Sequence, residues 1–323
     1  MCIVGTTIPS NVGTKKGHCR HNDFNTIVGT KKVYCRHNHI NAIVGTNSNN
    51  MTLITAIVNF KGGVAKTTTT INLGAGLKKL NERVLVIDTD PQGNVGINLQ
   101  GSEDAVLDKG LTVSHLYRDS RIDPRNAIIK TPYFDYIPNN LYSYELTNGL
   151  NDYRLLKQII ETLKPYYDHI IIDTPPYLGL DAINAIYASD NLLLVTDFSK
   201  ASLTGVQILV KVLDRWHDRE IAKVFKEKAK SILFTMFQRS TNLHNELINA
   251  TEDSKELGAG IMLKQRIPRA LKVVEDGYSG IPTIVASPRT KVALEYKSLA
   301  ETWKNARLTN KIHGSRFVAS IKK

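Results

Sequence analysis

The sequence has little cysteine, and all of it lies near the amino end. Cys2, Cys19 and Cys35 are the three cysteines among 323 residues. The rest of the chain therefore has no thiol for a disulfide, a cysteine-ligated cluster or a cysteine nucleophile. The chain also lacks the run of about 18 apolar residues that a membrane helix requires. Its first residues lack the apolar stretch of about 7–15 residues found in secretory signals. These absences exclude a transmembrane protein and predict a cytoplasmic location.

Acidic residues are scarce at both ends of the chain. Residues 1–50 hold six Lys/Arg and one acid, Asp23, and residues 302–323 hold six Lys/Arg and no acid. The tails carry most of the net charge of +12, because residues 51–301 hold 30 bases and 29 acids. Basic ends on a nearly neutral body favour a polyanionic partner, either nucleic acid or an anionic membrane. Simply solvated ends are the alternative.

The first fifty residues contain a tandem repeat. VGTKKGHCRHNDFNTI at 12–27 is followed by VGTKKVYCRHNHINAI at 28–43, a period of 16 residues. The repeat has no sustained helix or strand period, so we expect it to be disordered or not native. Four of its residues are possible zinc ligands, namely Cys19, His21, Cys35 and His37. Their Cys-x-His spacing differs from the usual zinc-ligand spacings. If the true start is Met51 instead, a chain beginning there should keep full activity.

The remaining chain alternates apolar strand-like runs with amphipathic segments. The expected strands are 53–59, 83–88, 134–138, 169–173, 191–196 and 231–237, and the expected helices are 66–80, 152–163, 203–216, 243–257 and 291–307. Continuous apolar strands that alternate with helices predict an α/β fold, with a mostly parallel twisted sheet covered by helices on both faces. We expect loops and short helices at 101–131 and a solvated helix face at 223–230. The predicted domain spans 51–309, between the repeat at 1–50 and a basic tail at 310–323.

A lysine- and glycine-rich loop lies between the first expected strand and the first expected helix. It reads FKGGVAKTTTT at residues 60–70. Such a turn directs several backbone N–H groups and the positive end of a helix at one point, which suits a phosphate. Lys66 can contact the β and γ phosphates of a nucleoside triphosphate, and the Thr67 hydroxyl can bind Mg²⁺. The residues assigned to the phosphate site are Lys61, Gly62, Gly63, Val64, Ala65, Lys66, Thr67 and Thr68.

The segment KGGVAKTT resembles the deviant Walker A motif, KGGxxK[ST], of the ParA/MinD family of partition and positioning ATPases. The resemblance implies a P-loop NTPase fold, ATP and Mg²⁺ as ligands, and a homodimer that forms on ATP binding. The first lysine of the motif, Lys61 here, then reaches the partner's phosphates, so Lys61 and Lys66 are both assigned catalytic roles. Ala65 replaces the usual glycine before the second lysine. This replacement fits the loop if the residue takes a helical φ.

Two further segments resemble the family in the same order along the chain. DTDPQGN at 88–94 resembles its DxDPQGN segment, whose second aspartate, Asp90 here, orients or activates the attacking water. HIIIDTPP at 169–176 resembles its Walker B strand, with Asp173 holding Mg²⁺ through water. The resemblance covers residues 53–303 and implies a hydrolase that turns over ATP.

The segment DTDPQGN matches the ParA branch of the family. The nitrogenase iron-protein branch needs cysteines for a cluster between subunits, and the body of this chain has none. The ParA branch implies nonspecific DNA binding, a nucleoid-associated location, and plasmid or chromosome partition with a ParB-like centromere-binding protein. Arg269 and Lys272 match a basic segment that contributes to DNA binding in the family. Capping or solvating a loop is the alternative role for these two residues.

Two alternative functions remain open. One is a MinD-like membrane-associated positioning ATPase, because apolar residues alternate with bases in the C-terminal tail. Gly314 interrupts that pattern, so we expect no membrane binding. The other is a nucleotide-dependent regulator that does not hydrolyse its ligand. A turnover assay separates this regulator from an ATPase.

Overall fold

The computed structural model describes residues 51–100, 110–238 and 261–308, all within the unit Met51–Lys323. The repeat with its possible zinc ligands, the expected helix at 243–257 and the basic tail lie outside the described residues. The predicted domain limits therefore stay a prediction.

The described strands form one sheet. They are β1 (Leu53–Val58), β2 (Val84–Asp88), β3 (Ile129–Lys130), β4 (Asp135–Ile137), β5 (His169–Asp173), β6 (Asn191–Thr196), β7 (Ala229–Phe237) and β8 (Ile261–Pro268). Their order is β3-β4-β2-β5-β1-β6-β7-β8, and each neighbouring pair is parallel except β3 with β4. The carboxyl ends of β1, β2, β5 and β6 therefore meet at one edge of the sheet. This edge carries the phosphate loop.

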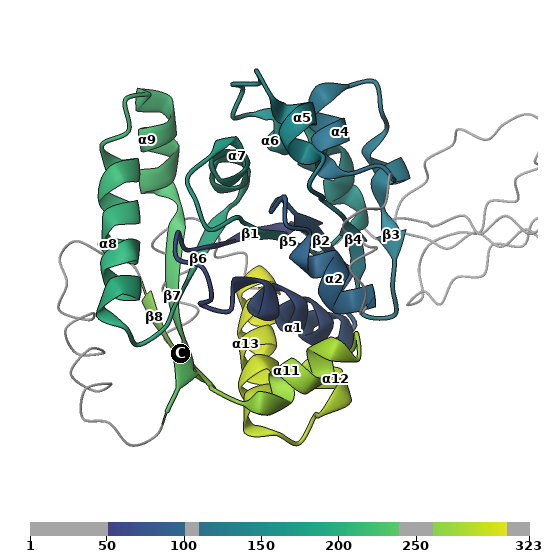
Figure 1. Cartoon of the computed structure of the whole chain (residues 1–323), viewed down its shortest axis with the longest axis vertical. Coiled ribbons are helices and arrows are strands. Elements are labelled where there is room, and N and C mark those ends of the chain that lie inside the picture. Colours follow the sequence, from purple (N-terminus) through teal and green to yellow (C-terminus); the bar gives the residue numbers. More distant parts are fainter. Residues whose placement is uncertain (1–50, 101–109, 239–260, 309–323) are drawn as a thin grey trace, which may run out of the picture. The chain divides into compact units, whose positions relative to one another are not determined.

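Helices cover both faces of the sheet (Figure 1). The described helices are α1 (Lys66–Lys79), α2 (Asn94–Gln100), α4 (Val113–Arg118), α5 (Ser143–Thr147), α6 (Leu155–Leu163), α7 (Leu180–Ala188), α8 (Lys200–Asp214), α9 (Arg219–Glu227), α11 (Leu271–Tyr278), α12 (Thr283–Ala286) and α13 (Lys291–Leu308), with 3₁₀ turns η1 (Pro124–Ala127) and η2 (Lys164–Tyr166). Alternate residues of β1 face opposite layers, as the pleat of a strand requires. Ile54 joins the apolar cluster of α4, α6, α7 and α8, whereas Leu53 joins that of α1, α12 and α13. The predicted α/β fold is confirmed.

Two strands and the end of the segment 223–230 differ from the sequence prediction. The sequence pattern missed β3, which has two residues, and β8, in which polar Gln265 is buried and Lys264 is exposed. An edge strand such as β8 has a neighbour on one side only, so it lacks the continuous apolar run of the central strands. The expected solvated helix face at 223–230 is wrong at its end, because α9 stops at Glu227 and Lys230 lies in β7. Lys228, between them, is partly buried. Its ammonium donates to the carbonyls of Tyr187 and Ser189, and burial lowers its pKa to about 8.

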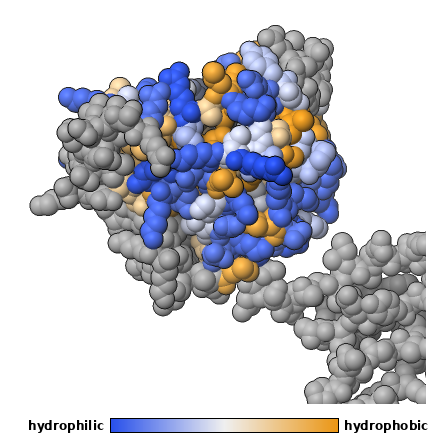
Figure 2. Space-filling model, turned by 90° about the horizontal axis from the view of Figure 1, so that it is seen from below, coloured by the Kyte–Doolittle hydropathy of each residue, from blue (hydrophilic) through white to orange (hydrophobic). Residues whose placement is uncertain are grey.

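The described surface carries only scattered apolar groups on the side seen in Figure 2, where hydrophobic residues form small patches within a mostly hydrophilic face. The most exposed large apolar side chains are Leu271 and Tyr278 of α11, at 82% and 84%. Val274 of the same helix is 56% exposed, so these three apolar side chains, three and four residues apart, share one face of α11. No described helix combines the length and apolar character needed to cross a membrane.

The last helix, α13, closes one face of the sheet. Trp303 is fully buried, and its indole Nε1 donates to Thr55 Oγ1 of the central strand β1 at 2.9 Å. One turn further, the buried Arg307 guanidinium pairs with Glu82 at 2.7 Å and with Asp168 at 3.3 Å. These two acids precede β2 and β5. Helix α13 thus connects three strands of the sheet at their amino ends.

We expect Trp303→Ala to lower the free energy of unfolding by about 3–5 kcal/mol, because it leaves a cavity and an unpaired Thr55 hydroxyl. Denaturant unfolding followed by circular dichroism measures this change. Leu308→Ala is the matched control on the same helix, because that side chain is 56% exposed. It should change stability by less than about 0.5 kcal/mol. Similar losses in the two variants would contradict the closing role of Trp303.

Candidate functional site

The phosphate loop begins at Asn59, directly after β1. The Asn59 side chain accepts from the Lys61 N–H at 2.9 Å and donates to the Val195 carbonyl of β6 at 2.7 Å. At the tip of the loop, Gly63 has a φ of 76°, a region that favours glycine. Apart from the adjacent residues in the chain, no described residue has an atom within 4 Å of a Cβ position built on Gly62 or Gly63. The loop is therefore held to the sheet at its start, while its tip leaves room for a ligand to approach the backbone.

The second half of the loop is buried beneath that tip. Val64 is fully buried, and its carbonyl accepts from Thr235 Oγ1 of β7 at 3.0 Å. Lys66 and Thr67 begin α1, and the half-buried Thr68 follows them in its first turn. The N–H groups at this helix end point toward the loop, as phosphate binding requires.

Ala65 has a left-handed backbone conformation, whereas alanine favours the right-handed one. Its φ is 66° and its ψ is 34°, which is left-handed. The helical φ that the sequence analysis set as the condition for Ala65 to fit the loop is therefore not found. An L-residue with a Cβ in this region costs about 1–2 kcal/mol relative to right-handed geometry. The loop keeps the conformation that a glycine would adopt, and Ala65 carries the strain.

Lys66 lies inside the site and is 7% exposed. Its ammonium donates to the Lys61 carbonyl at 3.3 Å. Burial lowers the pKa of Lys66, and the nearby carboxylates of Asp173 and Asp90 oppose this effect. The Lys66 ammonium is thus attracted by Asp173, at the end of β5, and by Asp90, in the turn after β2. An ammonium held in this way can neutralise the charge of a phosphate chain.

Asp173 ends β5 and is fully buried. Its carboxylate accepts from the Thr67 hydroxyl at 2.7 Å and from the Thr70 hydroxyl at 2.8 Å. Burial raises the pKa of Asp173 to about 6, although these two hydrogen bonds and Lys66 oppose the shift. A hydroxyl and a carboxylate side by side are oxygen ligands of the kind that Mg²⁺ prefers. Thr67 and Asp173 therefore suit a magnesium site.

The turn after β2 carries Asp90. The carboxylate of the buried Asp88 accepts from the N–H groups of Asp90 at 2.9 Å and Val95 at 3.1 Å, which fixes the turn. Asp90 itself is 5% exposed, and one of its oxygens accepts from the Gln92 N–H at 3.0 Å. Burial raises the pKa of Asp90, while Gln92, Lys66 and Asn94 oppose the shift. The structure thus brings Asp90 into the same electrostatic cluster as Lys66 and Asp173.

Lys61 is held within its own chain. Its ammonium pairs with Asp197 at 2.9 Å and donates to Ser199 Oγ at 2.8 Å, both from the loop after β6. The two partners are themselves joined, because Ser199 donates to Asp197 at 2.6 Å through its hydroxyl. The sequence analysis did not identify Asp197 or Ser199. Their position directly after an apolar strand that ends at the same edge was the available signal.

The two predicted DNA-binding residues lie elsewhere, Arg269 directly after β8 and Lys272 in α11. Arg269 is exposed, and its N–H donates to the Phe237 carbonyl at 3.1 Å. Lys272 lies in the first turn of α11 and pairs with Glu275 at 3.2 Å and with Asp276 at 3.0 Å. These acids offset the charge of Lys272. Of the two side chains, the exposed Arg269 is therefore the more available to a DNA phosphate.

We expect Ala65→Gly to raise the free energy of unfolding by about 0.5–1 kcal/mol. Glycine removes the strain of the left-handed conformation but adds entropy to the unfolded chain, which offsets part of the gain. Thermal or denaturant unfolding measures this change. Ala75→Gly, in the buried interior of α1, is the control and should be destabilising. A loss of stability in both variants would contradict the strain at Ala65.

Comparisons with known proteins show which family the chain resembles. A family model described as an AAA domain matches residues 51–227. The sporulation initiation inhibitor protein Soj of Bacillus subtilis is 34% identical over 258 residues, which is 77% of this chain and 96% of Soj. The chromosome partitioning protein ParA of Myxococcus xanthus is 30% identical over 250 residues, covering 76% of this chain and 86% of that protein.

A solved structure shares the architecture. The septum site-determining protein MinD of Pyrococcus horikoshii, complexed with Mg-ADP, superposes with a TM-score of 0.63 at 26% identity, covering 80% of this chain and 98% of MinD. The relatives match at nearly full length, and the family model spans more than half of this chain. The chain therefore belongs to the ParA/MinD family of ATPases.

Proposed function

We propose that this protein is a ParA-like ATPase that drives the partition of a plasmid or chromosome. In this proposal ATP and Mg²⁺ promote a homodimer, the dimer binds DNA without sequence preference, and hydrolysis reverses both steps. A ParB-like centromere-binding protein is the expected partner, and the nucleoid is the expected location. The observation that carries the proposal is the convergence of Lys66, Asp90 and Asp173 beside the phosphate loop.

Each of these residues has a distinct role in the proposed reaction. The N–H groups from Gly62 to Thr68 and the Lys66 ammonium bind the phosphate chain. Thr67 and Asp173 hold Mg²⁺, which supplies positive charge that stabilises the β and γ phosphates. Asp90 accepts a hydrogen bond from the attacking water and aligns it with the γ-phosphorus. Phosphoryl transfer depends mainly on such alignment and charge neutralisation.

Lys61 connects nucleotide binding with dimer formation in this proposal. Before dimerisation its charge is satisfied by Asp197 and Ser199 of the same chain. In the dimer it leaves them and reaches the phosphates of the partner's nucleotide. The partly exposed ion pair is weak enough to exchange, because such pairs contribute about 0–1 kcal/mol. Lys61 thus contacts Asp197 and Ser199 in the monomer and nucleotide phosphates in the dimer.

The proposed DNA contact lies at Arg269, with Lys272 as a weaker contributor. Arg269 is exposed, whereas Lys272 is paired with two acids on α11. Contacts between such cations and DNA phosphates release counterions, so binding should weaken steeply with salt.

A MinD-like role at a membrane is the second candidate function, supported by the similarity to MinD structures.

We expect Lys66→Ala to abolish ATP binding and Asp90→Ala to preserve it while lowering turnover by about 100-fold or more. Lysine removal leaves the phosphate chain without its buried cation, whereas Asp90 acts on the attacking water. Equilibrium titration with ATP and release of inorganic phosphate measure the two effects. Normal turnover by Asp90→Ala would refute the role given to that residue.

The proposed function predicts ATP-dependent DNA binding. The full chain should bind DNA of unrelated sequences with ATP, and weakly with ADP or without nucleotide. Arg269→Ala should lower the affinity and reduce the slope of log K against log salt by about 1. Lys223→Ala, an exposed base on α9, is the matched control and should keep both values.

Fluorescence anisotropy at two salt concentrations measures the binding. The same protein mixed with anionic vesicles and ATP tests the MinD-like candidate by co-sedimentation. ATP binding without DNA binding would contradict the partition role, and vesicle binding in that case would support the membrane role.

A further inference from the structure

Helices α8 and α9 connect β6 with β7 and pack against each other. Where the end of α8 meets α9, they leave an open groove of about 570 Å³, called the α8–α9 groove below. The partly buried Trp216 and Ala222 form its apolar wall. Its other lining residues are charged, and four of them are the cations Arg215, Arg219, Lys223 and Lys226. The proposed nucleotide chemistry gives none of these residues a role.

The four cations of the α8–α9 groove are exposed and unpaired. None of them forms an ion pair or a side-chain hydrogen bond with any residue in the described part of the chain. Arg219, Lys223 and Lys226 lie four and three residues apart, so they share one side of α9. Like charges at this spacing destabilise a helix. The row of cations is therefore a cost to α9 rather than a source of its stability.

The acids near the α8–α9 groove do not cancel this charge. Asp214 and Glu227 also line the groove, so its six charged residues keep an excess of two positive charges. The carboxylate of Glu220 is occupied, because it accepts from the Tyr187 hydroxyl at 2.7 Å and from the Tyr153 hydroxyl at 3.1 Å. Asp218 is the N-cap of α9 and accepts from two N–H groups in its first turn. The groove is therefore positively charged.

Apolar side chains extend the α8–α9 groove along α8. Ile208 and Val212 are 52% and 38% exposed. Arg215 continues the hydrogen-bond pattern of the helix, because its N–H donates to the Lys211 carbonyl at 3.2 Å. Ile208, Val212 and Arg215 are four and three residues apart and thus share one face. Since apolar side chains gain free energy when they leave water, this face favours a partner that covers it.

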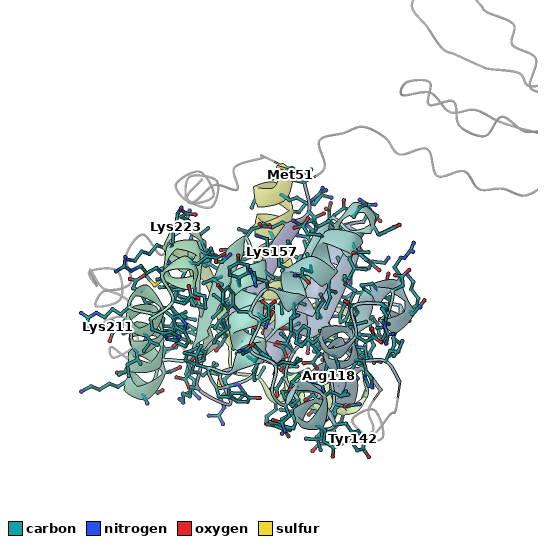
Figure 3. The ribbon with its side chains drawn as sticks, turned by 90° about the horizontal axis from the view of Figure 1, so that it is seen from above. Met51, Arg118, Tyr142, Lys157, Lys211 and Lys223 are labelled. Carbon is teal, nitrogen blue, oxygen red and sulfur yellow. The ribbon has the colours of Figure 1, made fainter. Side chains whose placement is uncertain are left out.

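The cations of both helices lie on the same side of the molecule. Figure 3 shows Lys211 of α8 and Lys223 of α9 at one end of the ribbon, with both side chains directed away from the sheet. Arg118 of α4 lies on another side in the same view. A partner that approaches this end therefore meets positive charge from α8 and from α9 together.

An acidic protein helix, DNA and an anionic membrane all complement this charge, but they differ in shape and polarity. A third helix fits the groove between two packed helices and brings apolar side chains with it. The DNA backbone brings phosphates and sugars, and would leave Ile208 and Val212 in water. A membrane surface is broad and flat, so it does not enter a concave groove. The combination of shape, charge and apolar surface favours the acidic helix.

We propose that the α8–α9 groove docks an amphipathic helix of a partner protein. The acidic side chains of that helix lie against the row of cations on α9, and its apolar side chains pack against Ile208, Val212 and Trp216. Tryptophan and arginine are the residues that most often carry binding energy at protein interfaces, and the groove holds both. This contact is distinct from the nucleotide and DNA contacts proposed above.

The test uses a synthetic peptide of about 18 residues, or about five helical turns, with leucines on one face and glutamates on the other. The full chain should bind the labelled peptide, as measured by fluorescence anisotropy. Binding should weaken as salt rises, because the cations of the groove are exposed. Two control peptides should bind at least about tenfold more weakly. One has lysines in place of the glutamates, and the other has the same composition in a scrambled order.

Variants of the chain locate the contact. Lys223→Glu and Arg219→Glu should each lower the affinity for the acidic peptide about fivefold. Glutamate suits the first turn of a helix, so Arg219→Glu should fold even if Lys223→Glu does not. Val212→Ser should lower the affinity about threefold without changing its salt dependence, because it removes an apolar contact only. Arg118→Glu makes the same change of charge at an exposed position elsewhere and should bind the peptide as the wild type does.

The outcomes separate the possible partners. No binding of the acidic peptide by the wild type, or equal affinities in the wild type and both charge-reversal variants of α9, would overturn the proposal. In the DNA-binding assay, Lys223→Glu should behave as Arg118→Glu does. A loss of DNA affinity specific to Lys223→Glu would assign the groove to nucleic acid and also overturn the proposal. The peptide measurements need neither nucleotide nor DNA, so their result does not depend on the proposed function.

Discussion

The burial of several carboxylates beside a single lysine is the constraint on which this site depends. Asp88 and Asp173 end neighbouring strands and stand opposite each other in the register of β2 and β5. Burial and this proximity raise the pKa of Asp88 well above its usual range. The protein disperses the charge through backbone N–H groups at Asp88 and through the hydroxyls of Thr67 and Thr70 at Asp173. Lys66 is the cation drawn into the cluster.

The excess of buried carboxylates over buried cations explains which ligands the site favours. Carboxylates that lack nearby cations favour the binding of a divalent metal ion, while the loop N–H groups and Lys66 favour phosphate oxygens. A magnesium nucleotide supplies both the divalent cation and the phosphate oxygens in one ligand. The sheet register fixes Asp88 and Asp173 at the ends of neighbouring strands, whereas Asp90 lies in the turn after β2.

The fold and the phosphate loop could be predicted from the sequence, because buried parallel strands and a glycine-rich turn leave strong local patterns. Edge strand β8 left a weaker pattern, since its exposed Lys264 and buried Gln265 interrupt the apolar run. The left-handed conformation of Ala65 had one signal, that it replaces the glycine usual in the motif, but alanine itself ordinarily indicates a helix. Asp197 was missed because its importance arises from an ion pair with Lys61, which lies 136 residues earlier in the phosphate loop. Its place directly after an apolar strand shows that it lies at the same edge of the sheet, but it does not identify this partner.

The hydrogen bond between Trp303 and Thr55 joins almost the first and almost the last described residues of the domain. A ribosome synthesises β1 about 250 residues before the indole that covers it, at about 5–20 residues per second. During that interval the central strand and the phosphate loop exist without the helix that closes their face of the sheet. A nascent chain interrupted before α13 would expose that apolar face to other proteins. Helix α1, which begins at the phosphate loop, therefore cannot complete its packing until α13 has been synthesised.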